Sequence, residues 1–419
     1  MSRLSGTLHM CEYRFRDMFK FNESNISDGK TTFERVDDIR FGRLDVLRSC
    51  SWAGEDIDCR AFKPVMTERG ACFSFNVLNS KKIYSNITSP EILTIDGNPD
   101  EDDWSMEQEL ERLLHSHEEK KNRPNYPYHL VTLDDFDSLD VELSSDPVDW
   151  YWNYKCEYSD TRSFKVFLHR SDEIKEAFYK PFEIEVGKKV IVSITPNVIV
   201  TSKNLEVYSS QIRRCYYNSE RKLKYFQIYT KSNCEFECFV NFTIAKCGCA
   251  KFSMPRERDT RVCDVYEMDC YAQALSVHRG GLKNNKDTDA ADFREKCNCI
   301  SPCADIQYIP QSNDLKYVGQ KIISNDSRTI LSLSFKKRKF LVLRKDEASS
   351  ITNRLATCGG ILGLFMGISL LSLIEMIVYC VVQFAKKLTV PKKTHLNLRQ
   401  KRLALQQHYI DAFSSMDEK

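Results

Sequence analysis

The sequence predicts an α+β membrane protein in which a disulfide-rich extracellular domain is followed by one transmembrane helix. The stretch between Leu355 and Phe384 is almost entirely apolar, and it exceeds the roughly 20 residues that a helix needs to cross a bilayer. Fifteen of the 17 cysteines precede this stretch. Five glycosylation sequons precede it as well, at Asn22, Asn25, Asn86, Asn241 and Asn325. Many cysteines together with sequons favour an oxidising, extracellular compartment.

Composition argues against several classes of function. The formal net charge of +2 over 419 residues leaves no basic surplus for binding nucleic acid. The eight histidines form no cluster with metal-ligand spacing, and we find neither a nucleophile motif nor a phosphate-binding loop. We therefore expect no enzyme activity, no metal and no cofactor. The alternative for the apolar stretch is a buried core helix, although soluble helices seldom stay apolar on every face for so long.

In the first half of the chain, the sequence predicts a mixture of helices and strands. A partial helical pattern runs from Phe33 to Leu47, and "CSWAGEDIDC" from Cys50 to Cys59 forms a short loop. The alternating stretch from Gly70 to Asn76 predicts a strand. The acidic run from Asp96 to Glu119 predicts a solvated surface, with a helical pattern over Glu107–Leu114.

Later segments are rich in β-branched residues and predict strands. These segments are "SFKVFLH" from Ser163 to His169 and "KKVIVSITPNVIVTS" from Lys188 to Ser202. Two more, "RTILSLSF" and "RKFLVLRK", lie between the cysteine-rich region and the apolar stretch. We expect these last two strands to lead toward the membrane.

The spacing of ten cysteines between Cys215 and Cys303 indicates a ladder of bridges. Cys234 and Cys238 would share one face of a helix, and Cys297 and Cys299 would share one face of a strand. An antiparallel helix and strand could then be joined by two matched bridges. The remaining cysteines could continue this nested ladder: Cys247 and Cys249 facing Cys263 and Cys270, with Cys215 and Cys303 outermost. Zinc is the alternative, but four-cysteine zinc sites favour C-x2-C pairs, which are absent.

Small residues form a ridge within the apolar stretch. Gly359, Gly363 and Gly367 recur every four residues and therefore line one side of a helix. Such spacing lets helices approach closely. A general helix-dimer motif is the alternative.

A polar stripe accompanies this ridge. Ser369, Ser372 and Glu375 recur every three residues. An ionisable group in a span is costly unless it faces a cavity or a partner, so it marks a functional site. Several copies around an axis would offer rings of oxygen to a small cation. Alternatively, Glu375 pairs with a basic partner or lies at the headgroup level.

Orientation follows from the cysteines, because the positive charges on the two sides of the span are nearly balanced. We expect residues 1–350 outside, a transmembrane pore helix over 351–385, and a cytoplasmic tail over 386–419. Met1 opens a polar stretch without the apolar core of a signal peptide. We therefore expect the chain to lack a natural N-terminal segment.

The chain resembles the degenerin/epithelial sodium channel family. "GGILGLFMGISLLSLIE" is similar to the pore helix of that family, and "LRSCSWAGEDIDCRAFKPVMTERGACFSFN" is similar to an upstream cysteine block. The ten-cysteine region resembles the thumb domain. "YKCEYSDTRSFKVFLHRSDE" resembles the insect pickpocket branch. The match extends from about Arg35 to Lys387.

The resemblance implies a subunit of a trimeric, amiloride-sensitive, sodium-selective cation channel at the plasma membrane, gated by an extracellular stimulus. The partners would be identical or related subunits and membrane lipid, and the permeant ion would be Na⁺. The extracellular domain would comprise palm, β-ball, knuckle, finger and thumb, with the finger over about 77–160 and the thumb over about 215–303. The sequence does not name the stimulus, ligand or matrix.

The resemblance also assigns roles to individual residues. The selectivity filter would be Gly367, Ile368 and Ser369. The amiloride-contacting position would be Gly363, with Ser372 and Glu375 along the pore, and the gating position would be Ala356. The implied bridges are Cys50–Cys59, Cys215–Cys303, Cys234–Cys299, Cys238–Cys297, Cys247–Cys270 and Cys249–Cys263.

Some features depart from the family pattern. The first span and the strand that follows it are absent, so a homotrimer of this chain is not expected to conduct alone. Thr357 stands where acid-sensing relatives carry an aspartate, which weakens the case for proton gating. Cys11 could pair with Cys72, which leaves Cys156 over. The alternative functions are a non-conducting regulatory subunit and a single-span, cysteine-rich receptor.

Overall fold

The computed structural model divides into two compact units, Met1–Asp346 and Glu347–Lys419, which are described separately. The residues that the structure describes are 2–10, 29–92, 95, 105–106, 110, 127–128, 138–145, 163–174, 181–279, 297–311, 316–317, 328–336, 341–367, 369–389 and 399–408.

One large sheet organises the first unit. Over the described residues its strand order is β10-β8-β11-β5-β1-β2, and both β9 and β12 also pair with β8. Its strands are β1 (Leu47–Trp52), β2 (Glu55–Asp56), β5 (Ser138–Ser144), β8 (Lys189–Thr201), β9 (Ala304–Pro310), β10 (Lys316–Tyr317), β11 (Arg328–Phe335) and β12 (Val342–Lys345).

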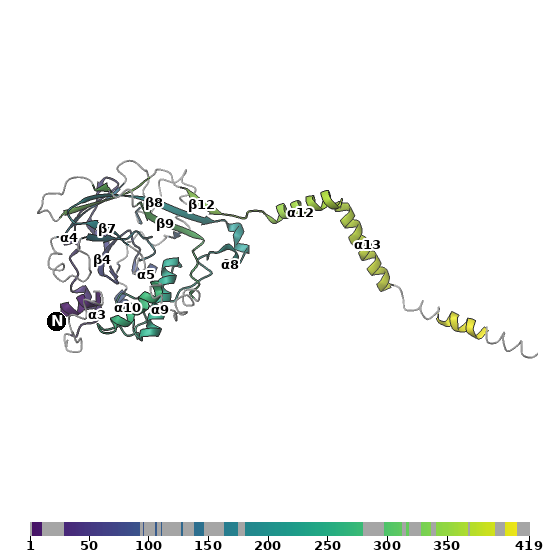
Figure 1. Cartoon of the computed structure of the whole chain (residues 1–419), viewed down its shortest axis with the longest axis horizontal. Helices are drawn as coiled ribbons and strands as arrows, with labels where there is room; N and C mark the ends of the chain where they lie inside the picture. The colour runs from purple at the N-terminus through teal and green to yellow at the C-terminus, as the bar shows by residue number, and fades with distance from the viewer. Residues whose placement is uncertain are drawn as a thin grey trace, which may run out of the picture. The chain divides into compact units, whose positions relative to one another are not determined.

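The long strand β8 is the spine of this sheet. It runs parallel to β11 and β12 and antiparallel to β9, and β9 and β12 lie beside it in Figure 1. Val190 and Val192 are fully buried while the residues between and beside them are half-buried, as expected when alternate side chains of a strand face the core. The strand predicted over Lys188–Ser202 is therefore confirmed, and so is the one at "RTILSLSF".

Two hairpins lie beside the large sheet. The first pairs β3 (Phe62–Thr67) with β4 (Gly70–Phe75), and the second pairs β6 (Ser163–Val166) with β7 (Phe182–Glu185). Gly70 has a φ of 100°, and a Cβ at this position would collide with Met10, so the turn between β3 and β4 requires glycine. The strand predicted at Gly70–Asn76 is confirmed by β4. The strand predicted at Ser163–His169 ends earlier, at Val166.

The two longest helices that the structure describes in the first unit build a second, helical core. α9 (Lys231–Cys247) begins at Thr230, whose side chain accepts a hydrogen bond from the Asn233 amide, and ends at Gly248 in the left-handed conformation. α9 packs against α10 (Met268–Arg279), and Phe239 lies at 0% exposure between them and the segment after β4. The other helices are short: α1 (Ser2–Met10), α3 (Thr32–Asp37), α4 (Arg43–Val46), α5 (Ser80–Ile83), α8 (Ser210–Arg213), η3 (Cys59–Ala61), η4 (Pro90–Ile92) and η7 (Lys203–Val207).

Near the N-terminus the structure differs from the predicted helix over Phe33–Leu47. A capping box between Thr31 and Glu34 starts α3, which ends at Asp37. A separate short helix then begins after Gly42, and Leu47 already belongs to β1. Pairing of β1 with β5 holds Leu47 extended against the tendency of the local sequence to form a helix. Of the helix predicted at Glu107–Leu114 only Leu110 is described, and it is helical and buried. Most of the predicted finger over 77–160 lies outside the described residues.

The second unit is helical where it is described. It contains α12 (Ile351–Met366), α13 (Leu370–Thr389) and a further helix over residues 399–408. Among the helices that the structure describes, none is both long enough and apolar enough to cross a membrane. The sequence predicts one helix over 351–385, whereas the structure has two, which Figure 1 shows as separate ribbons.

Candidate pore segment and its bridged support

The start of α12 is fixed by local hydrogen bonds. The Ser350 hydroxyl accepts from the Asn353 amide at 3.2 Å, as an N-cap residue does. The Thr357 hydroxyl donates to the Asn353 carbonyl at 2.8 Å. Ala356, the predicted gating position, lies in this part of α12 with its side chain exposed.

The break between α12 and α13 falls on the predicted filter. Gly367 ends α12 with a φ of 63°, a left-handed conformation that costs side-chain-bearing residues free energy. The Ser369 hydroxyl then accepts from the Ser372 amide at 3.2 Å and lies 3.0 Å from the Ser372 hydroxyl. Ser369 thus caps the start of α13, and its hydroxyl contacts both the amide and the hydroxyl of Ser372. Ile368, between them, lies outside the described residues.

Around this break the described residues leave open space beside three of the glycines. A Cβ built at Gly359, Gly360 or Gly367 would meet no atom within 4 Å. Gly363 is exposed on α12, and Glu375 is exposed on α13 one turn after Ser372. The predicted ridge of glycines and the polar stripe are therefore both open to partners from outside the chain.

Large apolar side chains on these helices are exposed in the same way. From Ile351 onward, every residue whose side chain the structure describes is exposed. Leu364 and Phe365 are 81% and 80% exposed. Contiguous apolar surface of this extent is rare on soluble proteins and marks contact with a membrane or with other chains.

In the part of the chain that the structure describes, six disulfides stiffen the first unit, and they join the pairs that the family resemblance implies: Cys50–Cys59, Cys215–Cys303, Cys234–Cys299, Cys238–Cys297, Cys247–Cys270 and Cys249–Cys263. The Cα–Cα distances for the two bridges of α9 to Cys299 and Cys297 are 5.7 and 6.0 Å. α9 is thus tied at its start to the segment before β9 and at its end to the region of α10.

One element of the predicted ladder differs. Cys297 and Cys299 do not lie on a strand. Between them, Asn298 has a φ of 47°, and its side chain donates to the Tyr216 hydroxyl at 2.8 Å. Asparagine tolerates the left-handed conformation better than most residues do. This conformation produces a turn that presents the sulfurs of both cysteines to α9.

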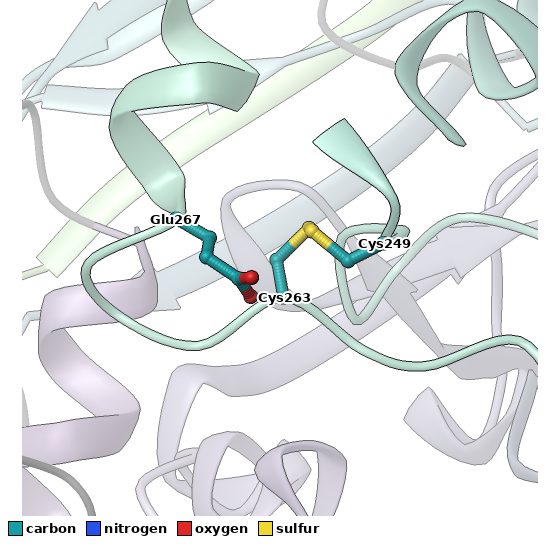
Figure 2. Close-up of side chains that lie close together, drawn as sticks. All are labelled: Cys249, Cys263 and Glu267. Carbon is teal, nitrogen blue, oxygen red and sulfur yellow. A yellow bond between two sulfur atoms is a disulfide. The ribbon is translucent and has the colours of Figure 1, made fainter. Parts of the chain in front are cut away.

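Three residues of the predicted thumb lie as close together as metal ligands do, but two of them are already bonded to each other. Cys249, Cys263 and Glu267 lie close enough to share an ion, but Figure 2 shows that the two sulfurs are bonded to each other. Disulfide sulfur is not the thiolate that binds metals. Glu267 instead accepts hydrogen bonds from Arg261 at 2.5 and 2.7 Å, and these bonds lower the pKa of its carboxyl group.

The structure also contains a buried ion network that the sequence did not predict. The Arg170 guanidinium donates to both oxygens of Asp172, at 2.8 and 2.5 Å, and to Asp305 at 2.8 Å. All three residues are buried. Burial alone would lower the pKa of Arg170, but the carboxylates of Asp172, Glu173 and Asp305 together outweigh burial and raise that pKa above its ordinary value.

This network joins the segment after β6 to β9. Beside it lies a cavity of about 350 Å³, which is also lined by the first turn of α9. The only signal in the sequence is the cluster of charges in "HRSDE", and it cannot reveal Asp305 as the third member because 135 positions separate Asp305 from Arg170.

Of the five sequons, two fall on described residues. Asn86 and Asn241 are both exposed, whereas Asn22, Asn25 and Asn325 lie outside the described residues. Cys11 and Cys156 also lie outside the described residues, so the predicted pairing of Cys11 with Cys72 stays a prediction. Cys72 itself is described, and its sulfur lies 3.4 Å from the Thr67 hydroxyl.

The sequence pattern of the family described as amiloride-sensitive sodium channel matches residues 3–379. The chain belongs to this family. It is 24% identical to Pickpocket protein 28 of Drosophila melanogaster over 351 residues, which cover 81% of this chain and 56% of that relative. It is 21% identical to Sodium channel protein Nach of the same species over 378 residues, covering 88% and 64%. It is 22% identical to Acid-sensing ion channel 4-B of Danio rerio over 380 residues, covering 87% and 57%.

These relatives confirm the resemblance to the degenerin/epithelial sodium channel family and to its insect pickpocket members. The family is made up of ion channels, not enzymes. The chain spans about half the length of the first curated relatives that it matches.

Proposed function

We propose that this chain is a subunit of a trimeric, amiloride-sensitive, sodium-selective channel of the plasma membrane, gated by an extracellular stimulus. The observation that carries the proposal is the helix break at Gly367–Ser369 inside an exposed, apolar segment. The family to which the chain belongs, and relatives named as sodium or acid-sensing channels, also support this function. The assembly partners are further copies of this chain or related subunits.

The break places non-helical backbone inside the apolar segment. Within a bilayer, backbone that leaves the helix must find hydrogen-bond partners, and it is tolerated where it lines a cavity or is buried in protein. α12 and α13 together form one interrupted span in this proposal, so the residues around Gly367 face a central pathway. Because α12 ends at Met366, its last carbonyls have no partners within the helix, and they can replace water around Na⁺.

The polar side chains extend this pathway. Gly367, Ile368 and Ser369 form the filter, with the Ser369 hydroxyl held by its capping bond to Ser372. Glu375 follows one turn later and attracts cations from the cytoplasmic side. Gly363, one turn before the filter on α12, leaves room for amiloride above it.

Gating starts in the bridged body, which is the disulfide-linked unit Met1–Asp346. The stimulus displaces the thumb, whose long bridges make it a stiff lever. The displacement reaches α12 through β12 and the few residues between Lys345 and Ser350. A shift of α12 around Ala356 then opens the pathway.

The filter assignment is tested by Ser369→Trp, expressed with partner subunits at the cell surface. We expect loss of current or loss of preference for Na⁺ over K⁺, measured from reversal potentials. Leu364→Trp, at an exposed apolar position of α12, is the control and should retain selectivity. Unaltered selectivity in surface-expressed Ser369→Trp would remove this residue from the filter.

The gating assignment is tested by Ala356→Phe. A bulky side chain at this point should hold the pathway open and give a persistent, amiloride-sensitive current without stimulus. Leu355→Phe, one residue earlier, is the matched control and should leave resting current low. If both variants behave like the parent at equal surface density, Ala356 does not control the gate.

A further inference from the structure

The sequon on α9 is locked inside regular structure. Asn241 is exposed, but the threonine of its sequon, Thr243, is completely buried. The Thr243 hydroxyl donates to the Phe239 carbonyl at 2.8 Å within the helix. The folded helix therefore presents an asparagine amide whose companion hydroxyl is inaccessible.

N-glycosylation requires both groups together. The transferase binds the threonine hydroxyl while the asparagine amide nitrogen attacks, and it needs a locally extended or turned backbone to do so. An α-helix places the two side chains two residues apart, on different faces. Folded α9 is therefore not a substrate, so modification of Asn241 can occur only before α9 is locked.

The order of synthesis leaves an interval for this step. The bridges that lock α9 join Cys234 to Cys299 and Cys238 to Cys297, across separations of 65 and 59 residues. Both partner cysteines enter the secretory compartment well after Asn241. Until they arrive, the sequon is on a chain that still lacks these two bridges.

We propose that Asn241 is N-glycosylated during this interval, before the thumb bridges close. A lipid-linked oligosaccharide diphosphate is the donor. The new bond joins the Asn241 side-chain nitrogen to the first sugar carbon, the nitrogen loses a proton, and the lipid diphosphate leaves. The inference rests on the extracellular placement of this region in the proposed function.

The glycan would stand on a defined face of the thumb. Asn241 follows Cys238 by three residues and Cys234 by seven, so all three share one side of α9. Near the start of α9 this side is covered, because Cys234 is buried at its bridge to Cys299. A branched sugar therefore keeps only the exposed surface around Asn241 in solvent, and that surface is then not a contact between neighbouring subunits.

Asn86 provides an internal reference. It lies in a turn closed by the Thr88 amide and the Ser85 carbonyl at 3.0 Å. Thr88 is also buried, with its hydroxyl on the Tyr225 carbonyl at 3.2 Å. No described disulfide joins this turn to another segment, so slowing bridge formation should affect Asn86 less than Asn241.

The test uses the full chain expressed in insect cells behind a cleavable signal sequence, with gel mobility measured before and after an N-glycan-removing amidase. Asn241→Gln should lose the mass of one glycan relative to the parent, and Asn86→Gln is measured in parallel. If Asn86 carries a glycan and Asn241 does not, the inference falls, and it also falls if neither is modified. Because the added signal sequence directs translocation, neither result bears on the proposed channel function, which the current measurements test.

The timing is tested with weakened sequons, because serine is a poorer acceptor residue than threonine. Thr243→Ser and Thr88→Ser should each be only partly modified. Dithiothreitol during synthesis should raise occupancy of Asn241 in the first variant and leave Asn86 unchanged in the second. The same rise is expected in Thr243→Ser combined with Cys297→Ser and Cys299→Ser. Unchanged occupancy under both treatments would overturn the proposed competition with bridge closure.

Discussion

The bridged body buries many of its large apolar side chains, whereas the helical C-terminal unit, Glu347–Lys419, exposes them. In the body, Phe239 and Val192 are at 0% exposure and even the guanidinium of Arg170 is buried. In α12, Leu364 and Phe365 are 81% and 80% exposed although they are as apolar. The body finds its partners within the chain, whereas in the proposed function the helices find theirs in lipid or in other subunits.

This difference predicts which property a substitution in each unit should change, folding stability or ion current. Changes in the body should alter folding stability first and current only as a consequence. Changes in α12 and α13 should alter current while the unfolding of the body stays the same. Each of the following variants tests one side of this contrast.

The largest effect on stability is expected from Arg170→Met. The substitution leaves the carboxylates of Asp172 and Asp305 buried without their cation, which costs about 3–5 kcal/mol. Denaturant unfolding of the purified chain, followed by intrinsic fluorescence, measures the loss. Arg60→Met is the control, because Arg60 is 71% exposed in its pair with Asp58 and should change stability by less than about 0.5 kcal/mol. Equal losses would show that the buried network is not a support of the body.

The next effect is expected from removing the bridge Cys215–Cys303 by serine substitution at both positions. This bridge closes a loop of 88 residues, whereas Cys50–Cys59 closes one of 9. Loss of the long bridge should cost about 2–4 kcal/mol, and loss of the short one less. Cys358→Ser, at an exposed position of α12, should leave unfolding unchanged. A larger effect from Cys358→Ser than from the long bridge would reverse the contrast between the units.

Gly367→Ala tests the other side of the contrast. A side chain in the left-handed conformation costs about 1–2 kcal/mol, so the break should shift toward continuous helix. We expect changed ion selectivity with unchanged unfolding of the body. Gly360→Ala lies in regular helix with open space around it and should preserve selectivity. Identical selectivity in both variants would contradict a role for the break.

The smallest effect is a pH dependence at Glu267. The hydrogen bonds from Arg261 lower the pKa of Glu267 in the folded protein. The carboxylate therefore stabilises the fold at neutral pH, and this contribution disappears as the pH falls through the lowered pKa. For a partly exposed pair it amounts to at most about 1 kcal/mol.

Glu267→Gln should consequently flatten the dependence of the melting temperature on pH between neutral and acidic conditions. Arg261→Gln should flatten it less, since the Asp264 amide still donates to Glu267 at 3.0 Å. If the parent and both variants lose stability in parallel on acidification, other carboxylates account for the acid sensitivity of the body.

Much of this protein follows from its sequence because the signals are local. Alternation of apolar residues determines β8 and β11, cysteine spacing indicates the ladder, and the motif around Gly363 and Ser369 indicates the family. The two-residue spacing of Cys297 and Cys299 was informative even though a turn, not a strand, presents their sulfurs.

Other features depend on contacts between distant segments, which no local pattern contains. Pairing with β5 converts Leu47 from the expected helix into strand. Asp305 joins Arg170 only because β9 lies beside the segment after β6. The break at Gly367 also needed the structure, because a run of apolar residues with good helix formers on both sides predicts continuity. Local propensity sets the free energy of each backbone conformation, and contacts between distant segments decide which one the chain adopts. At Gly367 the lack of a side chain permits the positive φ at which the helix ends.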